Sequence, residues 1–219
     1  MPRIAVCLSG CGVYDGSEIH EAVLTLLALD QAKAEIICCA PNVDQSAVVN
    51  HLDRSPTKEK RNVLIESARI ARGKIRDLAA IKASDIDALI FPGGYGAANN
   101  LCTFADEGPD CKVNPEDERL VGEMLDARKP VAAICLAPAM LARILGNRRI
   151  KAQLTIGTDA QTATALEKMG VRHADCPCAS FIVDRDHKIV TTPAYMLASG
   201  PAEAFEGIRG LVNEVLRLI

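Results

Sequence analysis

The sequence predicts an α/β fold with a mostly parallel sheet, and three observations carry that prediction. Short apolar runs typical of buried strands alternate with longer segments in which apolar residues recur at helical spacing. Several of these runs end in loops rich in glycine or other small residues. No internal repeat, linker or low-complexity segment interrupts the chain. Together they predict a single domain over residues 1–219, a doubly wound three-layer sandwich with helices on both faces of the sheet.

The first half of the chain is expected to alternate three strands with three helices. Apolar runs predict the strands, and Ser17, a residue type that caps helices well, marks the start of the first helix. The expected strands are 3–8, 35–40 and 87–91, and the expected helices are 17–32, 62–72 and 115–128. The segment 42–61 has the weakest pattern, and we expect it to be an excursion near the site.

The second half begins with the stretch around which the chain is organised. A short apolar run ends at Cys135, and small residues lead directly into a helical pattern over 140–145. Beyond it we expect a helix at 162–169, a hairpin that pairs 181–183 with 188–191, and a last helix at 201–218.

A cysteine between a buried strand and a helix has two interpretations. In a nucleophile elbow, a strained turn exposes one side chain above the sheet and aims the following backbone N–H groups at it. The helix N-terminus also favours a thiolate over a thiol. The alternative is an inert core thiol, because free cysteine is among the most buried residue types. The stretch around Cys135 leaves both interpretations open.

Two glycine-rich loops follow predicted strands. The turn at 92–99 contains Gly93 and Gly94, and glycine allows a backbone N–H to approach a ligand as closely as an oxyanion hole requires. The alternative is an ordinary tight turn, but its place beside the strand of Cys135 favours the functional interpretation. The loop at 10–16 resembles a dinucleotide fingerprint only weakly, since no acidic residue ends the second strand.

Two carboxylates and four histidines are the other candidates for chemistry. Glu18 and Glu21 share a face of the first helix, and each is either a surface acid stabilised by the helix dipole or a proton donor to the thiol. If Glu21 lies in the crevice, burial is expected to keep it protonated at neutral pH. The histidines do not form a visible Cys-His-acid triad. His20 should point away from the two acids, and we expect the other three to be solvated: His51, His173 and His187.

Composition narrows the class of protein. A net charge of −3 without a basic stripe argues against nucleic-acid binding, and 3% aromatic residues make base-stacking platforms improbable. The N-terminal strand is too short to span a membrane and has no convincing cleavage site, so the sequence predicts a cytoplasmic protein without membrane partners. An odd count of nine cysteines without CxxC pairs predicts reduced thiols, most of them acting as small hydrophobic residues.

These motifs resemble the superfamily of class I glutamine amidotransferase-like proteins, which includes the parkinsonism-associated deglycase and the PfpI-type proteases. The resemblance covers essentially the whole chain. Within it, the loop 8–21 and the late strand 191–196 are similar to the bacterial ElbB branch, described as a glyoxalase and linked to isoprenoid biosynthesis. The motifs that carry the wider resemblance are the strand-loop-helix with Glu21, the turn 92–101, the bend 133–138 and the strand 188–193.

The resemblance implies a flavodoxin-like fold and a role for each candidate residue. Cys135 matches the family nucleophile, and Glu21 falls where the family keeps the carboxyl that hydrogen-bonds the thiol, with Glu18 as second choice. Gly94 and the amide of Leu136, with Gly93 beside them, resemble the oxyanion-hole donors. Leu136 stands where the proteases carry histidine, which argues against protease or glutaminase activity.

The implied function is a cofactor-independent glyoxalase that needs neither metal nor glutathione. A thiolate adds to one aldehyde carbon of a small dicarbonyl to give a hemithioacetal, and two backbone N–H groups hold the alkoxide. A carboxyl then shuttles protons to give a thioester, and water releases glycolate from glyoxal or lactate from methylglyoxal. A homodimer is expected from the resemblance alone. The alternatives are a protein deglycase or a redox sensor based on an accessible thiol of low pKa.

Overall fold

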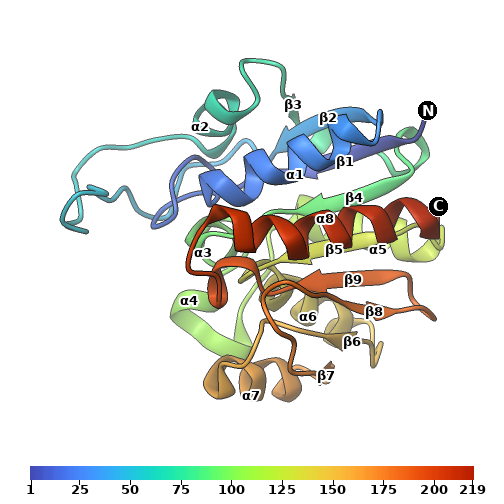
Figure 1. Ribbon diagram of the computed structural model, residues 1–219. Coiled ribbons are helices and arrows are strands. Elements are labelled where there is room, and N and C mark those ends of the chain that lie inside the picture. Colours follow the sequence, from blue (N-terminus) through green and yellow to red (C-terminus); the bar gives the residue numbers. More distant parts are fainter.

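A computed structural model describes residues 1–219 and contains a central sheet of seven strands (Figure 1). Their order across the sheet is β3-β2-β1-β4-β5-β9-β8, and every neighbouring pair is parallel except β8 and β9. The strands of this sheet are β1 (Arg3–Cys7), β2 (Glu35–Ala40), β3 (Arg76–Asp77), β4 (Ala88–Phe91), β5 (Val131–Ile134), β8 (Ile182–Asp184) and β9 (Ile189–Thr192). The predicted α/β class with a mostly parallel sheet is therefore confirmed.

Eight helices surround the sheet, and the apolar side chains beneath them form two cores. Residues of α1, α2 and α8 belong to the core on one face, and residues of α3, α5 and α6 belong to the core on the other. The helices are α1 (Ile19–Gln31), α2 (Val63–Ile70), α3 (Tyr95–Asn99), α4 (Phe104–Glu107), α5 (Pro115–Asp126), α6 (Ala137–Asn147), α7 (Ala160–Lys168) and α8 (Pro201–Leu218). None of them is long and apolar enough to span a membrane.

The structure differs from the sequence prediction at the start of α1 and in several short elements that were not predicted, among them β3, α3, α4 and one small sheet. Glu18, not Ser17, caps α1: its carboxylate accepts from the N–H of Glu21. The hydroxyl of Ser17 instead accepts from the N–H of Ser9. The strands β6 (Gln153–Leu154) and β7 (Arg172–His173) form a separate parallel pair, and two residues are too few to show a periodic pattern.

The three loops singled out in the sequence meet at one edge of the sheet. They follow β1, β4 and β5, which are neighbours in the sheet, and the carboxyl ends of parallel strands share an edge. Backbone hydrogen bonds join the first two loops directly. The N–H of Glu18 donates to the carbonyl of Gly93 at 2.9 Å, and the N–H of Gly96 donates to the carbonyl of Gly16 at 2.9 Å.

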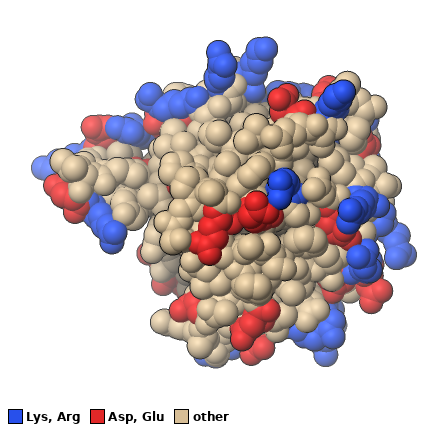
Figure 2. Space-filling view, in the orientation of Figure 1, with Lys and Arg blue, Asp and Glu red and all other residues tan.

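On the face that carries α1 and α8, most charged residues lie at the margin, and the middle is largely uncharged apart from a small, mainly acidic group (Figure 2). Lysines and arginines alternate with acidic residues around its margin, and no continuous basic stripe crosses it. This distribution matches the small net charge of −3 and offers no electrostatic track for a phosphate backbone on that face.

Gly96 is one of the residues at which the two loops are packed most closely. A Cβ there would lie 2.5 Å from the carbonyl oxygen of Ser9 and 2.6 Å from the Cα of Gly16. In an ordinary helix, glycine-to-alanine replacement stabilises by up to about 1 kcal/mol. Here we expect Gly96→Ala to lower the free energy of unfolding by about 2–3 kcal/mol, because backbone atoms have to move apart.

Urea unfolding under reducing conditions measures this difference. Gly200→Ala is the control, because Gly200 has an extended backbone and open space around its Cβ position. The two variants should differ by more than the error of the extrapolation. Equal stabilities would contradict the assigned packing of α3 against the first loop.

Candidate active site

Cys135 lies at a sharp bend between β5 and α6. Its φ is +59°, a left-handed conformation that costs a residue with a side chain about 1–2 kcal/mol. The surrounding structure holds the bend in place: the N–H of Cys135 donates to the carbonyl of Thr192 at 2.9 Å, and Pro138 lies in the first turn of α6. The side chain is 8% exposed, so the sulfur is nearly enclosed but still reaches a cavity.

Glu21 places a fully buried carboxyl against that thiol. The carboxyl and the Cys135 side chain are close neighbours on either side of Gly93, and each shifts the pKa of the other. Its Oε2 accepts from the N–H of Gly93 at 3.0 Å, and its Oε1 accepts from the N–H of Tyr195 at 3.1 Å. Three separate segments therefore fix the orientation of one carboxyl, which is the arrangement that a proton shuttle requires.

Glu18 occupies a different position from Glu21. Its Oε2 accepts from the N–H of Glu21 at 2.6 Å, which caps α1, and the residue also lines the cavity above Cys135. The structure thus places Glu21, and not Glu18, against the thiol. The helical spacing predicted that both acids lie near the site, but it could not predict which of them contacts the thiol.

Gly93 and Gly94 form the opposite wall of the site. A Cβ on Gly93 would lie 2.5 Å from the Cβ of Cys135 and 2.5 Å from Oε2 of Glu21. Gly94 has a φ of +98°, and a Cβ there would lie 2.3 Å from the backbone nitrogen of Glu18. Neither position can hold a side chain without moving the backbone.

Two backbone N–H groups lie beside the sulfur. The amides of Gly94 and Leu136 act to lower the pKa of the Cys135 thiol. Two amides from two different loops next to one thiol are the arrangement that an oxyanion hole beside a nucleophile requires.

Burial dominates the protonation of this pair. It raises the pKa of Glu21 to about 8, although the N–H groups of Tyr195 and Gly93 pull that pKa down. Burial, followed by the charge of Glu21, also raises the pKa of the Cys135 thiol well above its ordinary value. The expected thiolate at the helix N-terminus is therefore wrong, because desolvation outweighs the two amides and the helix dipole.

The thiol opens into a cavity of about 760 Å³. The sequence identified Cys135, Glu18, Gly94 and Leu136 among the lining residues but missed those contributed by later segments. The missed residues come from α3, α4, α7 and the turn after β9, and include Tyr95, Phe104, Asp106, Gln161, Thr162 and Tyr195. The tyrosine in the late motif 191–196 was the one available signal.

No histidine lines this cavity. The Nδ1 of His20 lies 2.8 Å from the hydroxyl of Tyr195, so His20 contacts a cavity residue. The prediction of three solvated histidines is correct for His51, which is exposed, and wrong for His173, whose side chain is 6% exposed and accepts from the N–H of Ile156. His187 is half-buried beside Asp184.

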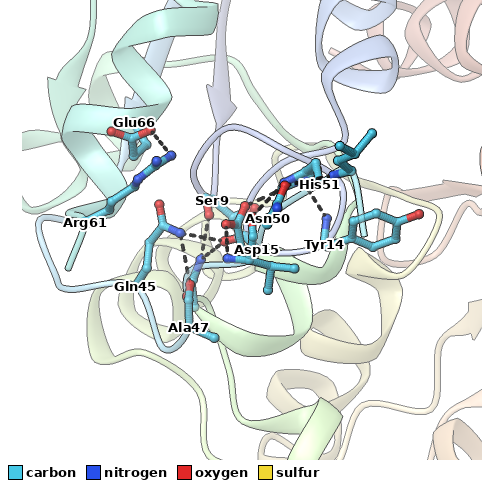
Figure 3. A network of polar contacts seen from close by, with 12 residues as sticks. Ser9, Tyr14, Asp15, Gln45, Ala47, Asn50, His51, Arg61 and Glu66 are labelled. Carbon is cyan, nitrogen blue, oxygen red and sulfur yellow. Dashed lines mark hydrogen bonds and ion pairs between the residues drawn. The ribbon is translucent and has the colours of Figure 1, made fainter. Parts of the chain in front are cut away.

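The excursion holds the first glycine loop in place (Figure 3). Its segment 41–62 reaches out from the sheet in Figure 1 and folds back toward Asp15. The amide of Gln45 donates to the carbonyl of Asp15 at 3.1 Å, and the N–H of Val49 donates to its carboxylate at 2.9 Å. The ring of His51 accepts from the N–H of Tyr14 at 3.2 Å. The expectation of an excursion near the site is correct.

A second buried acid lies on the other face of the sheet. Asp117, at the start of α5, is fully buried; one oxygen accepts from the thiol of Cys7 at 3.5 Å and the other has no partner. Burial raises its pKa to about 8. All nine cysteines are free, and no group of three or more His, Cys, Asp or Glu side chains is arranged to bind a metal.

The raised pKa values make stability depend on pH. Glu21 and Asp117 bind protons more tightly in the folded state, so their contribution is fully present below about pH 4.5 and is lost as the pH rises to about 8. Each carboxyl should lower the free energy of unfolding by about 1.4 kcal/mol per pH unit in that window. Urea titrations from pH 5 to 8 should show a shallower decline for Glu21→Gln and for Asp117→Asn, and slopes equal to the wild type would contradict the burial.

The sequence was compared with curated proteins and with solved structures. No model of a known protein family matches it. A human protein, glutamine amidotransferase-like class 1 domain-containing protein 3, mitochondrial, is 45% identical over 226 residues, which cover 99% of this chain and 83% of that protein. The rat ES1 protein homolog, mitochondrial, is also 45% identical, over 99% of this chain and 84% of that protein. The names of both relatives place them in mitochondria, which contradicts the predicted cytoplasmic location.

The solved structures agree with the family suggested by the motifs. An isoprenoid biosynthesis protein with an amidotransferase-like domain from Ehrlichia chaffeensis is 37% identical, with a TM-score of 0.94 over 100% of this chain and 99% of that chain. Drosophila melanogaster DJ-1beta, at 18% identity and a TM-score of 0.57 over 99% of this chain and 95% of that chain, shares the fold alone. The chain belongs to the family of glutamine amidotransferase-like class 1 domain-containing proteins.

Proposed function

We propose that this protein is a cofactor-independent glyoxalase that converts glyoxal to glycolate, and methylglyoxal to lactate, at Cys135. One observation carries the proposal: a thiol at a strained bend lies against a buried, oriented carboxyl and beside two backbone N–H groups that act to lower its pKa. The absence of histidine from the cavity argues against the protease and glutaminase routes.

The reactive form of the site carries one proton fewer than the resting form. With Glu21 at a pKa of about 8 and the thiol higher, both groups are protonated at neutral pH. Loss of the first proton leaves a carboxylate beside a thiol, which together act as a base and a nucleophile. Roughly a tenth of the molecules are in this form at pH 7, one unit below the pKa of Glu21.

The proposed reaction then proceeds in three steps: addition of the thiol, isomerisation and hydrolysis. Cys135 sulfur bonds to the aldehyde carbon while its proton passes to Glu21, and the resulting alkoxide, held by the amides of Gly94 and Leu136, takes that proton back. The Glu21 carboxylate removes the hydrogen on the same carbon as a proton and returns it to the neighbouring carbon, while the hydroxyl proton of the hemithioacetal moves to the neighbouring oxygen by way of an enediol. The hemithioacetal thereby becomes a thioester of a hydroxy acid. Water, deprotonated by Glu21, releases the acid and restores the thiol.

The surroundings of Cys135 do not favour the alternative of a redox sensor. It required an accessible thiol of low pKa, whereas Cys135 is 8% exposed and burial raises its pKa.

The name of the Ehrlichia structure links that protein to isoprenoid biosynthesis. The cavity here has no lysine, arginine or histidine with which to hold a diphosphate. The homodimer stays a prediction from the resemblance.

Production of glycolate by purified, metal-stripped protein tests the assignment of Cys135. We expect Cys135→Ser to lose at least about a thousandfold in kcat/KM, because the hydroxyl is a far weaker nucleophile than the thiol at this pH. Cys11→Ser is the matched control, since Cys11 is a partly exposed thiol that does not line the cavity. Equal rates for wild type and Cys135→Ser would refute the proposal.

The pH dependence tests the role of Glu21 separately. Because ionisation of Glu21 creates the reactive form, kcat/KM for glyoxal should rise about tenfold per unit below pH 8 and level off above it. Glu21→Gln should lose most turnover at every pH, and Glu21→Asp should keep part of the rate and a pH-dependent rise. A Glu21→Gln enzyme with the rate and profile of the wild type would remove the shuttle from the mechanism.

A further inference from the structure

The cavity above Cys135 is far larger than the proposed reaction with glyoxal requires. A volume of about 760 Å³ lies in the range of pockets that enclose drug-sized ligands. Glyoxal would occupy only a small part of it, next to the sulfur. The remaining space extends from the thiol toward α4 and α7, over segments that take no part in the proposed chemistry.

The lining of this remaining space is apolar and aromatic. Tyr95, Phe104 and Tyr195 each contribute a ring, and Leu136 and Met196 contribute aliphatic surface. Gln161 and Thr162 of α7 and the hydroxyls of the two tyrosines are neutral polar groups. A flat hydrophobic substituent would bury its surface here and keep its rim within reach of hydrogen-bonding groups.

The charged side chains that line the cavity are all acidic. Two carboxylates, Glu18 and Asp106, line it, and no lysine, arginine or histidine does. Two cations close to its edge already have partners: Lys112 pairs with Glu107 at 3.6 Å, and Arg143 donates to the carbonyl of the lining residue Pro109 at 3.3 Å. An anionic substituent would meet repulsion from the two carboxylates, and no cationic side chain lines the cavity to offset it.

We propose that the substrates suited to this site are 2-oxoaldehydes with a bulky, apolar or aromatic body that is uncharged or cationic, and that Asp106 disfavours anionic ones. The inference rests on the proposed function, because the oxoaldehyde group has to form the hemithioacetal with Cys135. Asp106 lies on exposed α4, outside the thiol, carboxyl and amide groups that carry out the reaction, so it acts on selection alone.

Hemithioacetal formation at Cys135 can be measured apart from turnover. The probes are glyoxal, phenylglyoxal, 4-carboxyphenylglyoxal and 4-(trimethylammonio)phenylglyoxal. Each dissociation constant comes from protection of the Cys135 peptide against iodoacetamide, read by mass spectrometry. The corresponding constants for N-acetylcysteine correct for the intrinsic reactivity of each aldehyde. Glycolate production from glyoxal by the same preparation reports on the proposed function independently.

After that correction, phenylglyoxal should bind at least about tenfold more tightly than glyoxal, because its ring fills the aromatic part of the cavity. The carboxylated probe should bind about tenfold more weakly than phenylglyoxal, and the cationic probe at least as tightly as phenylglyoxal. Asp106→Asn should reduce the penalty on the carboxylated probe by about threefold, a small factor because Asp106 is exposed to solvent. Asp110→Asn, an exposed acid four positions on that does not line the cavity, should leave the penalty unchanged.

The outcomes separate the two proposals. Turnover of glyoxal with no preference for the aryl probe, or with no penalty on the carboxylate, overturns the inference and leaves the proposed function standing. An unchanged penalty in Asp106→Asn overturns the role of that residue. Protection of Cys135 with the expected selectivity but without glycolate supports the inference and refutes the glyoxal reaction. No protection by any probe refutes both.

Discussion

The site depends on how closely the backbone at Gly93 and Gly94 approaches α1 and the bend at Cys135. Carboxyl, thiol and two amides meet only because no side chain separates them: a Cβ at either glycine would lie within 2.5 Å of a neighbouring atom. The same close approach lets the carbonyl of Gly93 accept from the N–H of Glu18, which fixes the start of α1 and hence the position of Glu21. This contact between loops thus determines both the packing around the site and the arrangement of its carboxyl, thiol and amide groups.

Desolvation then sets the charge of the site. A helix N-terminus favours a negative charge by about 0.3–1 kcal/mol at an exposed position. Raising the pKa of Glu21 from 4.5 to about 8 corresponds to about 5 kcal/mol against its ionised form. The larger effect prevails, and the resting site is neutral although two amides lie beside the sulfur. A buried, protonated thiol of this kind is less open to oxidation than an exposed thiolate.

Much of the fold and part of the site could be predicted from the sequence because the relevant signals are local. The apolar runs gave the central strands, and the glycines and the cysteine at strand ends marked the three loops that meet. The contribution of Tyr195 could not be predicted, because it acts through a backbone N–H whose position depends on the packing of a turn far along the chain. The cap on α1 was misassigned for a similar reason: Ser17 and Glu18 can both cap, and the partner of Ser17 at Ser9 decides between them.

The excursion at 41–62 makes the local stability of the site differ from the stability of the buried sheet. It is joined to the first glycine loop mainly by polar contacts to Asp15 and Tyr14, and its tip at Leu52 is 93% exposed. Segments held in this way open at a lower free energy than the strands of a buried sheet. The loop that borders the thiol can therefore lose its shape while both hydrophobic cores remain intact. We therefore expect the candidate site to lose its arrangement in a transition separate from global unfolding, and a cut or a bound partner at the excursion to act on the first transition alone.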